Sequence, residues 1–332
     1  MSNFWKDRKV LITGAGGFVG SNAVDFLLKS KCNITALISY RNSKNGLKKK
    51  LGNSMNKVRL LRSNLLNPIE ADKSCIGIDT VLNFAAVDGG SDFKKNHSAE
   101  AFSQNIRITL NMLEAATKSG VKKFLLVSSS DIYTSKQEKR ITEKDPVEIN
   151  WRNNIDGYKL AKWTSELAAR EFSRQYGMNI VIVRPGNLYG PRDNFEDKSK
   201  IRFIPSTIRK TFLDKEPIVL WGKGDQVRSF LYIDDFLKIC TKLIEKGVFN
   251  KPINVASKKH VTLKKLAQKI INMSEKEINL IIDSSPPGDA RVRIFTPSFL
   301  ESLIGKIEET DLDKGIKNTV SYFKIIYKIG NF

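Results

Sequence analysis

Apolar residues gather in short runs along the first half of the chain, separated by longer stretches in which apolar positions recur more sparsely. The runs are rich in Val, Ile and Leu, which is typical of parallel strands buried on both faces. We expect such strands at residues 10–12, 34–38, 58–61, 80–84, 124–127 and 180–183. Elsewhere apolar residues recur every three or four positions, which predicts surface helices at residues 18–30, 101–118 and 157–176. The alternation predicts an α/β fold with a doubly wound parallel sheet.

The pattern loosens after Pro185, where Gly, Pro and Asp become frequent between residues 186 and 225. Helical spacing returns at residues 235–246 and 263–272 and is followed by a Pro-Pro-Gly turn at 286–288. We therefore expect a first domain at residues 1–185 and a smaller mixed α/β lobe at residues 186–332. The helix near 235–246 is expected to return to the first domain.

A glycine-rich loop lies between the first strand and the first helix, in the order Gly14, Gly17, Phe18, Val19 and Gly20. Glycine lets the backbone turn tightly and lets a pyrophosphate approach the N-terminus of the helix. Such turns also occur as plain strand caps, but the position after the first strand favours a dinucleotide. The sequence thus predicts an NAD(P)-binding Rossmann-type domain, with the second lobe left to bind substrate.

The end of the second strand bears on the choice of cofactor. An acidic residue there would hold the ribose 2′-hydroxyl of NAD, whereas an arginine accommodates a 2′-phosphate. Here the strand ends Ser39-Tyr40-Arg41, without an acid. We therefore favour NADP(H), bound by Arg41 with help from Ser39, and keep NAD(H) as possible. The alternative is that Arg41 is an ordinary solvated loop residue.

Candidate chemistry lies in two segments. Tyr158 and Lys162 are one helical turn apart, and a nearby ammonium stabilises phenolate, so Tyr158 is a candidate acid/base. Ser129, Ser130 and Asp131 follow a predicted central strand at the sheet edge where such folds bind ligands. A serine there can hydrogen-bond a reacting oxygen. Alone, the helical pair could be surface groups and the serines could cap a turn.

Together with Asn83-Phe84-Ala85-Ala86, these motifs resemble the extended short-chain dehydrogenase/reductase family of sugar-nucleotide epimerases, dehydratases and reductases. The resemblance implies that Ser129 holds the reacting sugar oxygen and that Tyr158 is the acid/base. It also implies that Lys162 holds the nicotinamide ribose and lowers the pKa of Tyr158. The cofactor-binding residues it further implies are Asn64 and Leu65 near the adenine, and Ala85, Ala86 and Pro185.

Several segments are similar to the GDP-L-fucose synthase branch of this family, including 85–90, 187–195 and 221–231. The resemblance implies a nucleotide-sugar substrate, GDP-linked by this likeness, that contacts Asn187 and Arg228. An ion pair of Arg228 with Asp234 or Asp235 is the alternative. Trp221 is expected either to stack on the base or to lie in the core. The substrate-binding set is Ser129, Ser130, Asn187, Arg202, Trp221, Arg228 and Arg291.

The chain departs from that branch at two positions. Asp131 and Arg202 stand where the fucose synthases have the cysteine and histidine that move protons during epimerisation. Arginine does not give up its proton in proteins, so double epimerisation is in doubt. Asp131 also gives the serine cluster some of the character of a dehydratase, and we include it among the catalytic residues.

We therefore expect an oxidoreductase that moves hydride between NADP(H) and C4 of a nucleotide-linked hexose or heptose. An epimerase or 4,6-dehydratase that recycles bound NAD(P) is the alternative. A non-catalytic RNA-binding or scaffold protein is a remote third, suggested by the net charge of +21. The lysines are spread along the whole chain, which favours a solvated surface over a nucleic-acid site.

Other features of the composition exclude more than they identify. The three cysteines, Cys32, Cys75 and Cys240, are far apart and have no metal-ligand spacing, so we expect buried thiols and no metal site. No apolar stretch approaches the roughly 20 residues of a membrane span. We expect a cytoplasmic enzyme without a membrane partner, and the family resemblance implies a homodimer formed through helices 101–118 and 157–176.

Overall fold

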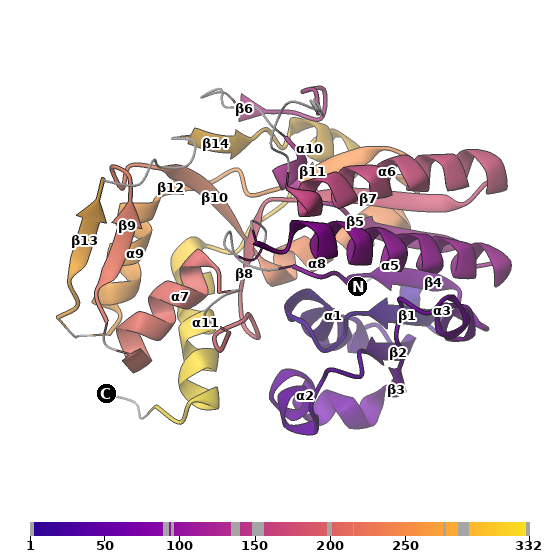
Figure 1. Cartoon of the computed structure of the whole chain (residues 1–332), viewed down its shortest axis with the longest axis horizontal. Coiled ribbons are helices and arrows are strands. Elements are labelled where there is room, and N and C mark those ends of the chain that lie inside the picture. Colours follow the sequence, from indigo (N-terminus) through magenta and orange to yellow (C-terminus); the bar gives the residue numbers. More distant parts are fainter. Residues whose placement is uncertain are drawn as a thin grey trace.

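A computed structural model describes residues 3–88, 93, 96–133, 140–147, 156–197, 201–214, 216–274, 277–284 and 292–329. Its larger body is a seven-stranded sheet with helices on both faces (Figure 1). The order is β11-β7-β5-β4-β1-β2-β3, and every pairing is parallel. The strands are β1 (Lys9–Thr13), β2 (Asn33–Ile38), β3 (Arg59–Arg62), β4 (Thr80–Asn83), β5 (Lys123–Val127), β7 (Asn179–Pro185) and β11 (Pro252–Val255). The doubly wound α/β fold is confirmed.

Alternate side chains of the central strands point to opposite faces of the sheet. Val10 and Ile12 of β1 pack in the core beneath α1 (Phe18–Leu28), α2 (Lys44–Leu51) and α8 (Ile233–Glu245). Leu11 packs on the other face, beneath α3 (Pro68–Cys75), α5 (Ser98–Lys118) and α6 (Gly157–Tyr176). All three side chains are fully buried, which explains why these strands are continuously apolar.

Two expectations about the sheet need correction. We expected the strand near 58–61 to be buried on both sides, but β3 is the edge strand, and Arg59, Leu60 and Arg62 are exposed. The seventh strand, β11, comes from the second half of the chain and was not predicted. It has the short sequence Pro-Ile-Asn-Val and pairs with β7, although much of the second lobe lies between the two strands in the chain.

The second lobe contains a mixed sheet in the order β12-β10-β14-β6, with β8 paired to β10. Only the β10–β12 pairing is antiparallel. A two-stranded sheet of β9 and β13 lies beside it (Figure 1). The strands are β6 (Arg140–Ile141), β8 (Asn187–Tyr189), β9 (Ile218–Trp221), β10 (Val227–Tyr232), β12 (His260–Thr262), β13 (Leu280–Asp283) and β14 (Val292–Phe295). The helices are α7 (Phe203–Arg209), α9 (Leu263–Asn272), α10 (Ser298–Ile304) and α11 (Leu312–Ile326).

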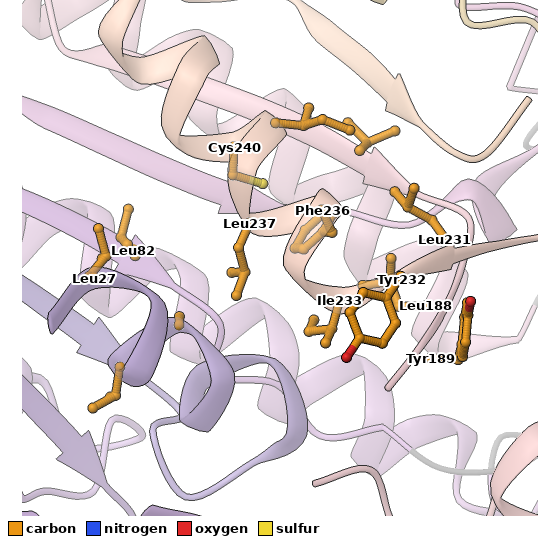
Figure 2. Close-up of a cluster of buried hydrophobic side chains, with 14 of the residues drawn as sticks. Leu27, Leu82, Leu188, Tyr189, Leu231, Tyr232, Ile233, Phe236, Leu237 and Cys240 are labelled. Carbon is orange, nitrogen blue, oxygen red and sulfur yellow. The ribbon is translucent and has the colours of Figure 1, made fainter. Parts of the chain in front are cut away.

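Helix α8 begins directly after β10 and joins the two bodies. Ile233, Phe236, Leu237 and Cys240 lie along its buried face (Figure 2). The same apolar cluster includes Leu27 and Leu82 of the first domain and Leu188, Tyr189, Leu231 and Tyr232 of the second lobe. A continuous core of this kind holds the edge of the sheet and the second lobe in a fixed relation, and the site lies along that junction.

Candidate active site

The glycine loop is shaped by two close backbone approaches. Gly14 has a positive φ of 65°, a conformation that favours glycine, and a Cβ there would lie 2.9 Å from the backbone of Phe84. At Gly20 a Cβ would lie 2.2 Å from the Gly14 carbonyl oxygen. The loop is therefore pressed against both the first helix and the end of β4, and any larger residue at Gly20 would force them apart.

The N-terminus of α1 fits a pyrophosphate. Its N-cap residue Gly17 provides no side-chain hydrogen bond, and the first turn has no acidic residue. The free backbone N–H groups and the helix dipole there favour an anion. Phe18 and Val19 follow at half-buried positions, so the loop, helix end and side chains form a cradle that fits a bound dinucleotide.

The loop after β2 runs beside the glycine loop. The Asn42 side chain closes against Gly16, where an added Cβ would meet it at 2.6 Å. Arg41 is exposed, and its backbone N–H donates to Ser39 Oγ at 3.2 Å. Arg62, which the sequence analysis missed, donates from Nη1 to the Asn42 carbonyl at 3.0 Å. Two arginines thus lie where a ribose 2′-phosphate would be expected.

The segment after β3 is held by short-range hydrogen bonds. Glu70 accepts from the backbone N–H of Asn64 at 2.8 Å, and Asn64 Oδ1 accepts from the backbone N–H of Leu66 at 3.2 Å. The Leu65 side chain is buried, and its carbonyl accepts from Asn111 Nδ2 at 2.8 Å. The Asn64 side chain therefore stabilises the turn after β3 by a local hydrogen bond.

The segment after β4 is tied to the first strand. Thr13 Oγ1 donates to Asn83 Oδ1 at 2.7 Å and accepts from the backbone N–H of Ala85 at 3.0 Å. Ala85 is half-buried and Ala86 is exposed at the carboxyl edge of the sheet. The two alanines therefore border the side of the glycine loop on which β4 lies.

The predicted catalytic residues come together. Tyr158 and Lys162 lie on the first turns of α6, which begins at the side-chain cap Asp156, and Ser129 follows β5. Ser129 lies close enough to Tyr158 to lower the pKa of the phenol, and all three side chains are more than nine-tenths buried. Lys162 Nζ donates to the Val127 carbonyl at 2.7 Å and lies 5.6 Å from the centroid of the Tyr158 ring.

The direction of the pKa shift at Tyr158 is opposite to the one expected. Burial raises the pKa of Tyr158 well above its ordinary value, and the negative charges of Asp88 and Asp131 raise it further. The hydrogen bond from Ser129 and the positive charge of Arg202 lower the pKa, but by less. Lys162 does not overcome the burial of the phenol, so Tyr158 is a protonated acid in the protein alone.

Asp131 lies in an ion pair that the sequence did not indicate. Arg293 of β14 donates from Nη1 to Asp131 Oδ1 at 3.2 Å and from Nη2 to the Ser130 carbonyl at 2.7 Å. Asp131 also donates its backbone N–H to Ser129 Oγ at 3.1 Å. A carboxylate held by a guanidinium is a poor acceptor for a further proton.

Arg202 lies next to the α1 cradle. Its guanidinium is 5.0 Å from the Phe18 ring centroid and donates from Nη2 to Asp193 Oδ1 at 2.8 Å. Asp193 is buried, and the negative charge of Asp88 also acts on Arg202. The structure therefore places a fixed cation beside the catalytic phenol, at the position where the fucose synthases have histidine.

The remaining residues expected to bind substrate lie on the second lobe. Asn187 is exposed on β8 and donates from Nδ2 to the Ser229 carbonyl at 3.0 Å. Arg228 on β10 is buried, so the alternative of a surface ion pair is wrong. Trp221 is 63% exposed on β9, so the alternative of a core position is also wrong. Arg291 lies outside the described residues.

Two buried polar groups that support the site were missed. On α5, Asn105 Oδ1 accepts from the Val87 backbone N–H at 2.9 Å, and its Nδ2 donates to the Val87 carbonyl at 2.8 Å. This clip fixes the chain next to Asp88. An asparagine on the buried face of an amphipathic helix was the available signal.

The second missed group is a buried network behind the catalytic turn. Arg184 of β7 forms a two-pronged ion pair with Glu166 of α6, at 2.9 and 2.6 Å. Arg184 also donates to the Tyr133 hydroxyl at 2.7 Å, and that hydroxyl donates to Asn254 Oδ1 at 2.9 Å. The network connects α6, β7, β11 and the turn that carries Ser129, so it fixes their relative positions.

Other expectations can be checked on the described residues. All three cysteines are buried thiols, and burial raises the pKa of Cys32 to about 11 and that of Cys75 to about 12. Within the described ranges, no group of His, Cys, Asp or Glu side chains could hold a metal ion. Nor does any helix in that part of the chain have the length and hydropathy needed to span a membrane.

A doubly wound sheet with a glycine cradle and a buried Ser-Tyr-Lys set defines a dinucleotide-dependent enzyme of the short-chain dehydrogenase type. Comparison with known families gives the same answer in more detail. Residues 10–256 match the NAD dependent epimerase/dehydratase family, and the chain belongs to it. The resemblance to the extended short-chain dehydrogenases is thereby confirmed.

Relatives of known name cover nearly the whole chain. A dTDP-4-dehydro-6-deoxy-D-allose reductase from Streptomyces sp is 33% identical over 97% of this chain and 98% of its own length. The GDP-L-fucose synthase of Escherichia coli is 27% identical, covering 95% and 96%. The structure is similar to that of a dTDP-glucose 4,6-dehydratase from Streptomyces venezuelae, with a TM-score of 0.81, 22% identity and coverage of 96% and 97%. This last similarity supports the fold alone.

Proposed function

We propose that this protein is an NADP(H)-dependent reductase that converts the C4 ketone of a nucleotide-linked deoxyhexose to a hydroxyl group. The reductases that are 33% and 32% identical carry names of this reaction type on a dTDP-sugar. A dTDP-linked 4-keto-6-deoxyhexose is therefore the first substrate to test. The GDP-linked sugar suggested by the fucose synthase resemblance is the second.

The two reductases of 33% and 32% identity carry the proposal, and the environment of Tyr158 agrees with it. Reduction of a ketone needs an acid that protonates the developing alkoxide, whereas an epimerase or dehydratase that begins by oxidising the sugar needs a base at the same place. Tyr158 is buried beside Asp88 and Asp131, and both negative charges disfavour phenolate. The protein alone thus prepares Tyr158 in the protonated form that reduction uses.

The roles of the neighbouring residues follow from their contacts. The reduced dinucleotide, when bound in the α1 cradle, supplies hydride. Ser129 lies close enough to Tyr158 to lower the pKa of the phenol, so its hydroxyl can hold the sugar O4 next to the phenol. As Tyr158 gives its proton to O4, the Lys162 ammonium stabilises the phenolate that forms. The Val127 carbonyl keeps that ammonium in place.

The two substituted positions argue against epimerisation. Arg202 stays charged and cannot return a proton to a ring carbon, and Asp131 is already paired with Arg293. Arg202 is better suited to hold an anionic or carbonyl oxygen of the substrate. On the second lobe, Arg228 and Asn187 would bind the nucleotide diphosphate, and the exposed Trp221 ring would stack on the base.

The preference for NADP(H) is supported by the two arginines. Arg41 precedes Asn42 in the loop after β2, and Arg62 at the end of β3 donates to the Asn42 carbonyl. A guanidinium fork suits a ribose 2′-phosphate, and the last residues of β2 offer no carboxylate for a 2′-hydroxyl.

The test is a direct spectrophotometric assay with purified protein. dTDP- and GDP-linked 4-keto-6-deoxyhexoses are each incubated with NADPH or NADH, and absorbance at 340 nm and the product's NMR spectrum are recorded. We expect net consumption of NADPH, with the dTDP-sugar as the better substrate. Sugar conversion without net loss of NADPH would show a closed redox cycle and refute the reductase assignment.

A further inference from the structure

The turn that follows catalytic Ser129 is held from the other lobe by one side chain. Arg293 lies on β14, and the turn is the short 3-10 segment Ser130–Ile132. The guanidinium makes two contacts with it, one to the Asp131 carboxylate at 3.2 Å and one to the Ser130 carbonyl at 2.7 Å. The two side chains of the ion pair are 22% and 33% exposed, so solvent screens the contact only in part.

The contacts are arranged so that the position of Arg293 is passed on to the catalytic hydroxyl. The Asp131 backbone N–H donates to Ser129 Oγ at 3.1 Å. The same hydroxyl lies close enough to Tyr158 to lower the pKa of the phenol. A shift of the turn would therefore move the Ser129 hydroxyl, and displacements of about 1 Å in an active site can cost roughly 100-fold in rate.

The negative charge of Asp131 acts on Tyr158, near the place where the proposed anionic nucleotide sugar would react. An unpaired carboxylate here would repel that substrate and offer a base close to the sugar ring. The ion pair with Arg293 occupies one carboxylate oxygen and balances its charge. Asp131 therefore stabilises the turn as the anionic partner of Arg293.

We propose that Arg293 is a positioning residue that clamps the Ser129–Asp131 turn and keeps Asp131 out of proton transfer. It acts through Asp131 and Ser130, from a strand of the second lobe. The proposal rests on the proposed reductase function, since it explains why this site reduces a ketone without exchanging protons on the ring carbons. Arginine is needed because only its planar fork reaches both acceptors at once.

The experiment is a double-mutant cycle on the full chain, with Arg293→Gln, Arg293→Lys, Asp131→Asn and the double variant R293Q/D131N. We expect Arg293→Gln and Arg293→Lys each to lower kcat by about 10- to 100-fold, with an unchanged KM for NADPH. Asp131→Asn should lose less than about tenfold, because the backbone bond to Ser129 remains. The double variant should be no slower than Arg293→Gln. Arg59→Gln on the exposed edge strand β3 is the matched control and should equal the wild type.

Several results would overturn the clamp. A fully active Arg293→Lys variant would show that charge suffices without the fork. Strictly multiplicative losses in the double variant would show that Arg293 does not act through Asp131. An inactive Asp131→Asn variant, or solvent deuterium at C3 or C5 of the wild-type product made in D₂O, would show that Asp131 moves protons.

Thermal unfolding separates this proposal from the reductase assignment. Arg293→Gln should lower Tm by about 2–4 °C in the wild-type background. In the Asp131→Asn background, the same substitution should lower Tm much less. If the wild type reduces no nucleotide sugar but this coupling in Tm is found, the reductase function fails and the clamp stands. If the wild type is active but the Tm losses add independently, the clamp fails and the function stands.

Discussion

The ion pair of Glu166 with Arg184 should be the most costly single contact to break near the active site. Their side chains are only 5% and 3% exposed, and the two hydrogen bonds between them are 2.9 and 2.6 Å long. Glu166→Gln keeps the size of the side chain but removes its charge. Arg184 would then be a buried cation with one neutral amide partner, still donating to the Tyr133 hydroxyl.

The magnitude follows from the desolvation of the remaining charge. Breaking a buried ion pair from one side costs about 3–5 kcal/mol, because the partner is left charged and uncompensated. For a chain of 332 residues, each kcal/mol lowers Tm by roughly 1.5 °C. We therefore expect Glu166→Gln to unfold roughly 4–8 °C below the wild type.

The same helix provides a matched control. Glu171 pairs with Arg174 at 2.7 Å and with Arg170 at 3.2 Å, but its side chain is 45% exposed. Surface pairs contribute about 0–1 kcal/mol, so Glu171→Gln should leave Tm nearly unchanged. Thermal and urea unfolding, followed by circular dichroism, would measure both variants. A Glu166→Gln protein that unfolds within about 2 °C of the Glu171→Gln control would refute the reasoning.

Three further predictions concern the chemistry and its pH dependence. Tyr158→Phe removes the proton donor, so kcat should fall by at least ~100-fold with unchanged NADPH binding by fluorescence; substantial residual turnover would rule Tyr158 out as the acid. Arg41→Ala should raise the KM for NADPH about tenfold or more while that for NADH stays constant, and equal effects on both cofactors would argue against a 2′-phosphate contact. Burial lowers the pKa of Lys50, which donates to the Arg192 and Asp193 carbonyls, to about 8 from 10.5. The unfolded chain then binds the proton more tightly, so the free energy of unfolding should rise between about pH 8 and 10.5. The Lys50→Met variant should lack this rise. Parallel pH profiles of the free energy of unfolding for the two proteins would contradict the pKa shift.

The sequence by itself determined the parts of the protein that depend on local spacing. The apolar runs located five buried strands of the main sheet, because a strand buried on both faces must be continuously apolar, and they also located the exposed edge strand β3. The glycine loop was recognisable because Gly14 and Gly20 are required by close backbone approaches. Tyr158 and Lys162 were found because one helical turn separates them.

Tertiary structure alone decided how distant residues modify one another. Arg293 reaches Asp131 across 162 positions of the chain, and no local pattern marks that pair. The pKa of Tyr158 rises because burial and two carboxylates outweigh the neighbouring cations, a balance that depends on distances and not on spacing. The edge position of β3 and the arrival of β11 were likewise set by strand order. Local sequence fixes which residue types are present, but electrostatic and packing energies depend on separations in space, and only the folded chain defines those.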